Sequence, residues 1–197
     1  MNSNGLIDLK YCRQIRNVKI GNYRHIILID LKTNLIYLKI IFQKKYESHQ
    51  DEKNFITSMQ KISRISGHPS LLPIINFEPH EINQFPTITT IYMANGTLSE
   101  VMANIHKYGD LNFTGTKKYI NLLGISIGMR FFYFNFIIHG NLSMNNIFLD
   151  ENYYPHIVNY EIYKEATDEE FYFKRIRAQS DDLYNFSIIA YELISGC

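Results

Sequence analysis

The chain has 197 residues, a formal net charge of +1, and 46% apolar against 20% charged residues. These proportions are typical of a folded globular protein and exclude a disordered chain. A net charge this close to zero argues against nucleic acid or an anionic membrane surface as the partner.

The cysteines, the histidines and the apolar runs indicate in which compartment the protein lies and whether it binds a metal. Cys12 and Cys197 are the two cysteines, and they have no C-x-x-C spacing. The seven histidines show no ligand spacing with cysteine or acidic residues, so no metal site is predicted. The apolar runs at 131–138 and 187–194 are too short to span a bilayer, and the chain starts without a signal-like segment. We therefore expect a cytoplasmic protein.

The first elements in chain order are predicted to be strands. Residues 19–26 favour a strand-turn-strand hairpin with Gly21 in the turn. A loop that cradles phosphate would need several glycines, because backbone amides must approach the phosphate oxygens closely, and here one remains. Residues 35–41 are predicted to be a further strand, which carries Lys39.

The next elements are a helix and another strand. The helix is predicted at 54–65, with Phe55, Met59 and Ile62 on one face. It leads into Gly67-His68-Pro69, which marks the boundary before the following strand. Residues 86–98 are predicted to form a strand that ends in a turn.

Two helices are predicted in the second half. The helix at 120–134 has apolar residues at helical spacing, as a buried amphipathic helix would: Ile120, Leu123, Gly124, Ile127, Phe131 and Phe134. The last helix, at 182–196, carries apolar residues on more than one face: Ile188, Ile189, Tyr191, Leu193 and Ile194. Some of these would face water, which predicts a protein partner, self-association or an incomplete gene product.

The segment 139–150 reads H-G-N-L-S-M-N-N-I-F-L-D and is the most informative stretch. It resembles the catalytic loop of the protein kinases, H-R-D-L-x-x-x-x-N, in which the aspartate accepts the proton of the substrate hydroxyl. Asn141 stands in the place of that aspartate, and an amide cannot accept the proton. Asn159, Tyr160 and Glu161 follow at the distance of the D-F-G motif, so the metal-binding aspartate is replaced as well.

The resemblance extends from about residue 6 to the C-terminus. Among the protein kinases, the chain is similar to the tyrosine-kinase-like group. It implies these vestigial nucleotide contacts: Gly21, Lys39, Thr90 as the gatekeeper, Tyr92 and Met93 in the hinge, and Asn146. It also implies structural roles for His139, for Tyr160 and for Asp182, the buried acid that anchors the catalytic loop.

Three further positions depart from the family pattern. The family places alanine and leucine on either side of adenine, whereas this chain has Tyr37 and Phe148. The pocket is therefore predicted to be filled by its own side chains. Ser58 takes the place of the helix glutamate that pairs with the strand lysine, so we expect Lys39 to reach water or to find an acid elsewhere.

The resemblance implies an α+β, bilobal protein-kinase-like fold that forms one domain over residues 1–197. A small β-rich N-lobe with one helix, together with the hinge, would occupy about residues 6–93. A truncated, mostly helical C-lobe would occupy residues 94–197 and end at the helix that carries Asp182.

The missing carboxylates lead to the functional hypothesis. Magnesium ions neutralise the phosphate charge in phosphoryl transfer, and amides such as Asn146 and Asn159 offer no negative charge to hold them. We therefore predict a pseudokinase that is not an enzyme and acts as a binding or scaffold module in signalling. No cofactor is expected, and a protein partner is expected at the exposed last helix.

Two alternatives stay open. The first is a protein kinase, acting on serine, threonine or tyrosine, that binds ATP with magnesium and retains residual phosphotransfer. The second is a truncated remnant of a kinase.

Overall fold

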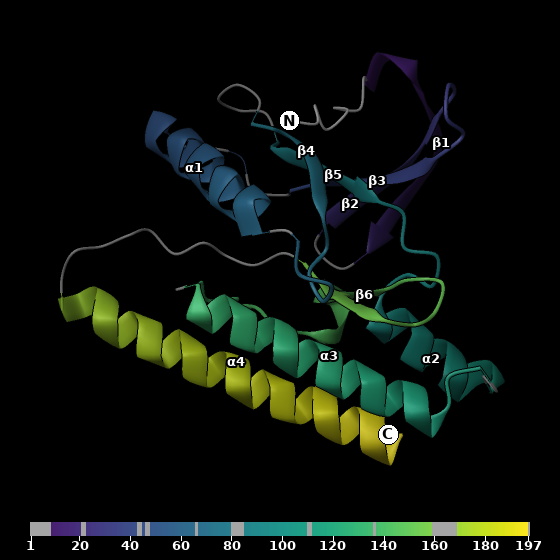
Figure 1. Cartoon of the computed structure of the whole chain (residues 1–197), viewed down its shortest axis with the longest axis vertical. Helices are drawn as coiled ribbons and strands as arrows, with labels where there is room; N and C mark the ends of the chain where they lie inside the picture. The colour runs from purple at the N-terminus through teal and green to yellow at the C-terminus, as the bar shows by residue number, and fades with distance from the viewer. Residues whose placement is uncertain are drawn as a thin grey trace. The chain divides into compact units, whose positions relative to one another are not determined.

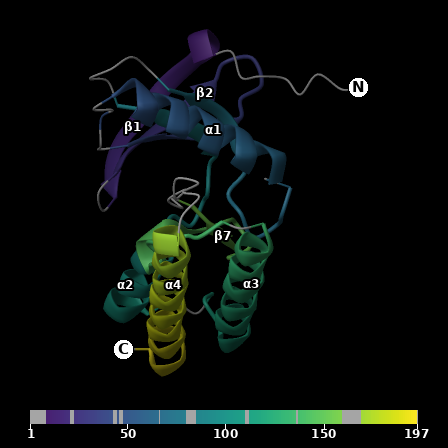
Figure 2. The same cartoon turned by 90° about the vertical axis from the view of Figure 1, so that its left-hand side faces the viewer.

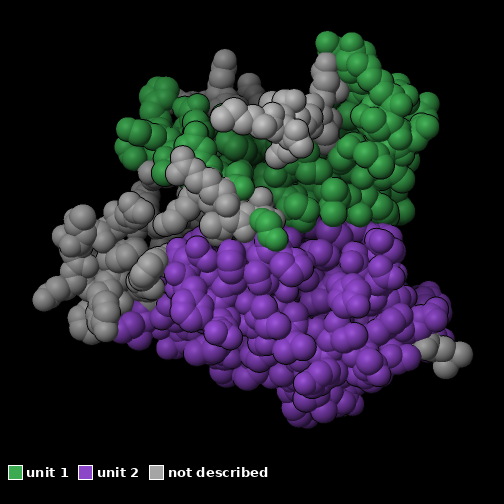
Figure 3. Space-filling view, viewed as in Figure 1, with its two compact units in different colours: residues 1–67, 73–92 green, residues 68–72, 93–197 purple. Residues whose placement is uncertain are grey.

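The computed structural model describes residues 9–20, 23–42, 45, 48–65, 67–79, 85–109, 112–135, 137–158 and 169–196. It consists of two compact units, which have separate colours in Figure 3. Unit 1 comprises residues 1–67 and 73–92, and unit 2 comprises residues 68–72 and 93–197. The predicted α+β class, with a β-rich first part and a mostly helical second part, is confirmed.

Unit 1 is built on a five-stranded antiparallel sheet with the strand order β1-β2-β3-β5-β4 (Figure 1). Its elements are the 3-10 turn η1 (Leu9–Tyr11), β1 (Cys12–Ile20), β2 (Tyr23–Asp30), β3 (Ile36–Ile41), α1 (His49–Ile65), β4 (Ile74–Glu78) and β5 (Thr87–Ile91). The predicted hairpin is formed by β1 and β2. Gly21, which was predicted to form the turn, lies outside the described residues.

Helix α1 begins at His49, earlier than the predicted start at Asn54. The side chain of Ser48 accepts a hydrogen bond from the Asp51 backbone N–H over 3.3 Å, which is the interaction of an N-cap residue. Asp51 and Glu52 in the first turn favour the positive end of the helix dipole. This polar turn has no apolar residue, so hydrophobic periodicity could not detect it.

Aromatic contacts attach α1 to the sheet. The ring of Phe55 lies edge-on to the rings of Phe42 and of Phe77, with centroid distances of 5.7 and 6.4 Å. Phe77 of β4 pairs with Ile88 of β5, and Ile88 pairs with Ile40 of β3. Directly opposed residues project from the same face of a sheet. The contact with Phe77 therefore attaches α1 to the face that carries Ile40 and Ile88.

Unit 2 is mostly helical (Figure 2). Its elements are α2 (Leu98–Tyr108), α3 (Gly115–Phe134), the 3-10 turn η2 (Met144–Asn146), β6 (Ile147–Leu149), β7 (Pro155–Ile157) and α4 (Glu169–Ser195). Strands β6 and β7 form a two-stranded antiparallel sheet. The last helix begins at Glu169 rather than at the predicted Asp182.

Helix α3 lies close to β7 because the two positions that face this strand are glycines. A Cβ added at Gly128 would lie 2.7 Å from Cδ1 of Ile157, and one at Gly124 would lie 2.6 Å from Cγ of Pro155. Both distances are far inside van der Waals contact. A larger residue at either position would have to push the helix and the strand apart.

The apolar face predicted for α3 is not the buried one, because none of its six residues is fully buried. Leu123, Ile127 and Phe134 are exposed, with 48%, 43% and 70% of their surface accessible. The buried residues of α3 are Asn121, Ile125, Gly128, Met129 and Phe132. The helix is apolar on several sides, so the periodicity alone did not select the face that packs. No helix among the described residues is long and apolar enough to cross a membrane.

Candidate nucleotide and phosphotransfer site

Lys39 lies in the middle of β3, opposite Ile26 of β2 and Thr89 of β5. Its ammonium group forms an ion pair with the carboxylate of Glu78 at the end of β4. The hydroxyl of Thr87 donates a hydrogen bond of 2.8 Å to the same carboxylate oxygen. Only 19% of the Lys39 side chain is exposed. The pair is thus partly desolvated, which strengthens it and fixes the position of the ammonium group.

The acid that pairs with Lys39 comes from β4 because of the sheet geometry. Adjacent residues of a strand project to opposite faces, so Glu78 points away from the face on which Phe77 contacts α1. Lys39 shares the face of Glu78, as their ion pair requires. The expectation that Lys39 finds an acid elsewhere is confirmed. The side chain of Ser58, at the predicted glutamate position in α1, lies outside the described part of the chain.

The gatekeeper and hinge positions are engaged within their own units. Thr90 is fully buried, and its hydroxyl donates to the Pro73 carbonyl over 2.6 Å. The Tyr92 backbone N–H donates to the Ile36 carbonyl over 3.2 Å, which extends the pairing of β3 with β5. Met93 is buried in unit 2. The nucleotide role of these three residues stays a prediction, and the Tyr92 amide is already used inside the sheet.

The two residues predicted to fill the adenine pocket are both buried. Tyr37 of β3, in unit 1, is 8% exposed, and Phe148 of β6, in unit 2, is 2% exposed. Phe148 forms an isolated bridge with Thr97, at the start of α2. The two rings therefore belong to different units. Occlusion of a pocket by the two rings together stays a prediction.

Asp182 anchors the segment that resembles the catalytic loop. One of its oxygens, Oδ2, accepts hydrogen bonds from the backbone N–H groups of His139 and Gly140 over 3.0 and 3.1 Å. The residue is fully buried, and this burial raises its pKa, which the backbone donors counteract. Asp182 lies in α4, so a residue far along the chain holds the start of the loop in place.

Two asparagines fix the rest of the loop. The Nδ2 group of Asn146 donates to the Asn141 backbone carbonyl over 2.7 Å, and the Asn146 carbonyl accepts from the Val158 N–H over 3.0 Å. Asn146 is buried, whereas the side chain of Asn141 is exposed. The predicted ligand-type residue Asn146 therefore braces the backbone, and Asn141 presents its amide to solvent where the motif has the catalytic acid.

His139 is held as a neutral ring. Its Nε2 lies 2.9 Å from the Val158 carbonyl, so Nε2–H donates, and its Nδ1 accepts from the Asn141 N–H over 3.2 Å. A proton on Nδ1 would remove this second bond. Burial lowers the pKa of His139 to about 4, although the hydrogen bond to Val158 acts in the opposite direction. The ring is thus a structural element of the loop, as the resemblance implies.

Acidification is expected to destabilise unit 2 through His139. The folded-state pKa is about 4, below the ordinary value of 6.5, so the stability that depends on the neutral ring is complete above pH 6.5 and is lost as the pH falls toward 4. The loss amounts to about 3 kcal/mol. Urea unfolding of wild type and His139→Gln at neutral and at acid pH measures it. Equal acid dependence of the two proteins would contradict the expectation.

Several candidate residues lie outside the described part of the chain. These are Gly21, Asn159 and Tyr160. Among the described residues, no group of three or more His, Cys, Asp or Glu side chains is placed to hold a metal ion.

Sequence reasoning missed Glu78 as a member of this site. The available signal was an acid directly after Ile74-Ile75-Asn76-Phe77, in the strand expected after residues 67–69. Glu78 can be assigned to Lys39 only when the strand order is known, because β4 lies two strands away from β3 in the sheet.

The chain matches the family model "Protein tyrosine and serine/threonine kinase" over residues 14–197. It therefore belongs to the protein kinase family. It is 22% identical over 173 residues to the "Probable LRR receptor-like serine/threonine-protein kinase" of Arabidopsis thaliana. The aligned region covers 80% of this chain and 25% of the relative.

Two further relatives are receptor kinases of plants. The leucine-rich repeat receptor protein kinase MSP1 of Oryza sativa subsp. japonica is 23% identical over 181 residues, which is 80% of this chain and 14% of the relative. The leucine-rich repeat receptor-like protein kinase PEPR2 of Arabidopsis thaliana is 22% identical over 177 residues, which is 80% of this chain and 16% of the relative. The chain thus spans a quarter or less of the length of these relatives.

The prediction that the chain is not an enzyme is wrong on these findings. The chain belongs to a kinase family, and a relative is named as a serine/threonine-protein kinase. The sequence argument equated the loss of two carboxylates with the loss of activity. Removing a general base typically lowers a rate by about 10²- to 10⁴-fold, which slows a reaction without removing the scaffold that binds and orients the reactants. On this argument, amides at positions 141 and 159 do not by themselves exclude an enzyme.

Proposed function

We propose that the chain is a protein-kinase domain of the tyrosine-kinase-like group that binds ATP through Lys39 and phosphorylates serine or threonine hydroxyls slowly. The observation that carries the proposal is the ion pair of Lys39 with Glu78, because it orients the one lysine that the family uses to hold nucleotide phosphates. The preference for serine and threonine rests on the name of a relative. The cytoplasm is the proposed compartment, since a chain with two cysteines shows no disulfide framework.

The proposed reaction is slow because of the group at position 141. The substrate oxygen bonds to the terminal phosphorus, and the bond from that phosphorus to the bridging oxygen of ADP breaks. The proton of the attacking hydroxyl passes to water, because the exposed Asn141 amide cannot accept it. The loop around Asn141 is nevertheless held by Asp182 and Asn146, so the attacking group can still be positioned.

Magnesium is the other component that the family implies. The described residues hold no carboxylate cluster for it, and Asn146 uses its Nδ2 group to brace the loop. Asn159 lies outside these residues. The residues described do not form a magnesium site, and we assign no step to the metal. Lys39 supplies positive charge toward the phosphates.

Lys39→Ala is expected to weaken ATP binding by about 10- to 100-fold, because one charge-assisted hydrogen bond contributes about 1.5–3 kcal/mol. A fluorescent ATP analogue titrated into the purified chain, with and without magnesium, measures the dissociation constant. Lys53→Ala, at an exposed position of α1, serves as the matched control and should bind as wild type does. If Lys39→Ala binds ATP as tightly as Lys53→Ala, the proposed function fails.

A protein partner at α4 is a second proposed function, compatible with the first. The observation that favours it is the exposure of large apolar side chains on this helix. Tyr184, Tyr191 and Ile194 have 67%, 66% and 73% of their surface accessible. Apolar side chains this exposed on one helix are typical of an interaction surface.

A further inference from the structure

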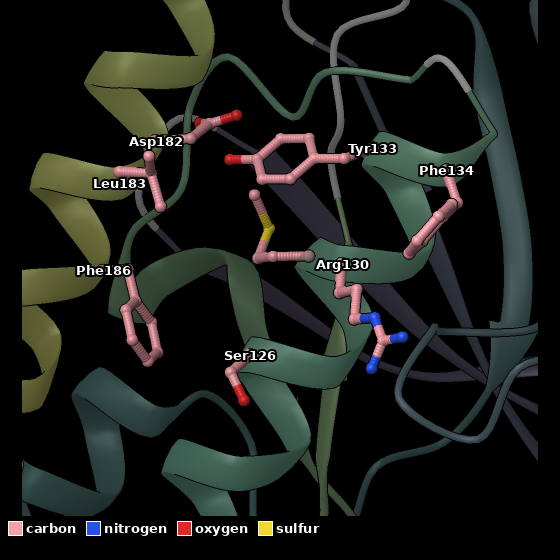
Figure 4. Close-up of a pocket in the computed structure, with 8 residues that line it drawn as sticks. Ser126, Arg130, Tyr133, Phe134, Asp182, Leu183 and Phe186 are labelled. Carbon is pink, nitrogen blue, oxygen red and sulfur yellow. The ribbon is translucent and has the colours of Figure 1, made fainter.

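A pocket of about 430 Å³ lies between α3 and α4, within unit 2 (Figure 4). Its walls are mainly apolar and include Met129 and Phe134 of α3 and Leu183 and Phe186 of α4. This volume falls in the range of roughly 300–1,000 Å³ that is usual for small-molecule sites. None of the predicted nucleotide contacts that lie in the described part of the chain lines it.

Two buried polar atoms in this pocket have no hydrogen-bond partner among the residues that the structure describes. They are Oδ1 of Asp182 and the hydroxyl of Tyr133. Asp182 is fully buried, and its other oxygen, Oδ2, already accepts the N–H groups of His139 and Gly140. Figure 4 shows the Tyr133 hydroxyl and the Asp182 carboxylate close together at one end of the pocket. Buried polar atoms in native proteins normally have partners, so a pair of unpartnered ones indicates a missing donor.

The chemistry of the missing donor follows from its surroundings. A carboxylate and a phenol oxygen both accept hydrogen bonds, and a carboxylate additionally favours a positive charge. Burial, together with the charge of Asp182, raises the pKa of Tyr133 to about 12, so its hydroxyl stays protonated and uncharged near neutral pH. An anionic ligand would meet the Asp182 charge in an apolar setting, which is unfavourable.

The other charged residue of the pocket does not oppose a cation at Asp182. The guanidinium group of Arg130 lies over the ring of Phe134, 5.3 Å from its centroid. Figure 4 shows it pointing away from Asp182, and the Arg130 side chain is exposed to solvent. Its charge is therefore screened by water, whereas the acceptors at the Asp182 end are buried.

We propose that this pocket binds an apolar molecule that carries a single protonated amine, with the ammonium group donating to Asp182 Oδ1 and to the Tyr133 oxygen. The apolar body of the ligand packs against Met129, Phe134 and Phe186. Because the same carboxylate holds the backbone of His139 and Gly140 through Oδ2, an occupied pocket also steadies the start of the loop that carries Asn141.

The test compares three probes of similar shape, 2-phenylethylamine, 2-phenylethanol and 3-phenylpropanoate, titrated into the purified chain near neutral pH and followed by NMR chemical shifts. We expect the amine to bind at least about tenfold more tightly than the alcohol, and the carboxylate to bind more weakly than either. The amine should also slow the hydrogen exchange of the His139 and Gly140 amides. Equal affinity of the amine and the alcohol, or preference for the carboxylate, overturns the proposal.

Substitutions at other residues test whether the amine binds in this pocket. Asp182 itself is kept, because its removal would release the loop. Ser126→Trp places a large ring in the pocket and should abolish amine binding. Ser187→Trp, at an exposed position of α4 that does not line the pocket, is the matched control and should bind as wild type does. Tyr133→Phe removes one acceptor and should weaken the amine more than the alcohol. Amine binding that survives Ser126→Trp in a folded protein contradicts the assignment.

Discussion

Replacing Asp182 with alanine is expected to lower the free energy of unfolding by about 3–6 kcal/mol, because two charge-assisted hydrogen bonds contribute about 1.5–3 kcal/mol each. The carboxylate oxygen Oδ2 accepts both the His139 and the Gly140 N–H groups at ordinary hydrogen-bond distances. Asp182 is fully buried, and so is His139. The His139 N–H would therefore be left in a dry environment with its partner gone. Urea unfolding near neutral pH measures the change.

The neighbouring acid provides the control for this variant. Asp181 is exposed on α4, so Asp181→Ala should change the unfolding free energy by no more than about 0.5 kcal/mol. Asp182→Asn keeps one acceptor oxygen and should fall between the two. If Asp182→Ala unfolds at the same urea concentration as Asp181→Ala, the loop is held by other contacts and the anchoring role assigned to Asp182 is wrong.

The parts of the fold that the sequence predicted correctly are those set by local pattern. The hairpin of β1 and β2 was predicted from a turn glycine, and the helix that contains Phe55 was predicted from the spacing of its apolar residues. The start of α1 was predicted too late because this helix begins with a polar turn, for which hydrophobic periodicity contains no signal. The start of α4 was also predicted too late, because the resemblance placed it at Asp182.

The partner of Lys39 could not be predicted, because it depends on strand order and on the alternation of side chains between faces. Glu78 follows Lys39 by 39 positions in sequence, and it reaches the lysine because β5 lies between β3 and β4 in the sheet. The family motif directed attention to α1 and to Ser58. One residue of shift in β4 would have placed Glu78 on the opposite face and removed the ion pair.

The hydrogen-bond partner of Asn146 in the loop could not be predicted from the sequence either. The motif assigns it a ligand role, but its Nδ2 group holds the Asn141 carbonyl, and its backbone carbonyl pairs with Val158. A side-chain amide has donors and an acceptor, so its residue type does not reveal which neighbour it serves. The pairing became known only from the positions of β6, β7 and the turn before them.

Asn141→Asp is expected to raise the rate of phosphoryl transfer by about 10²- to 10⁴-fold, which is the usual contribution of a positioned general base. Aspartate and asparagine have nearly the same shape. The backbone of this residue is fixed from both sides, through its N–H to His139 and through its carbonyl to Asn146. The substitution therefore changes the chemistry at an exposed side chain and leaves the loop in place. Release of ADP in the presence of a serine-containing peptide measures the rate.

The matched control for this experiment is Asn145→Asp, which introduces the same charge at another exposed position of the same loop. It should leave the rate unchanged, because a carboxylate there does not stand at the base position of the motif. Thermal unfolding of both variants should agree with wild type to within the small effect of a surface charge. An equal rise in both variants would mean that net charge rather than a base sets the rate. No rise in Asn141→Asp, in a folded protein that binds ATP, would mean that the proton of the hydroxyl is not what slows the transfer.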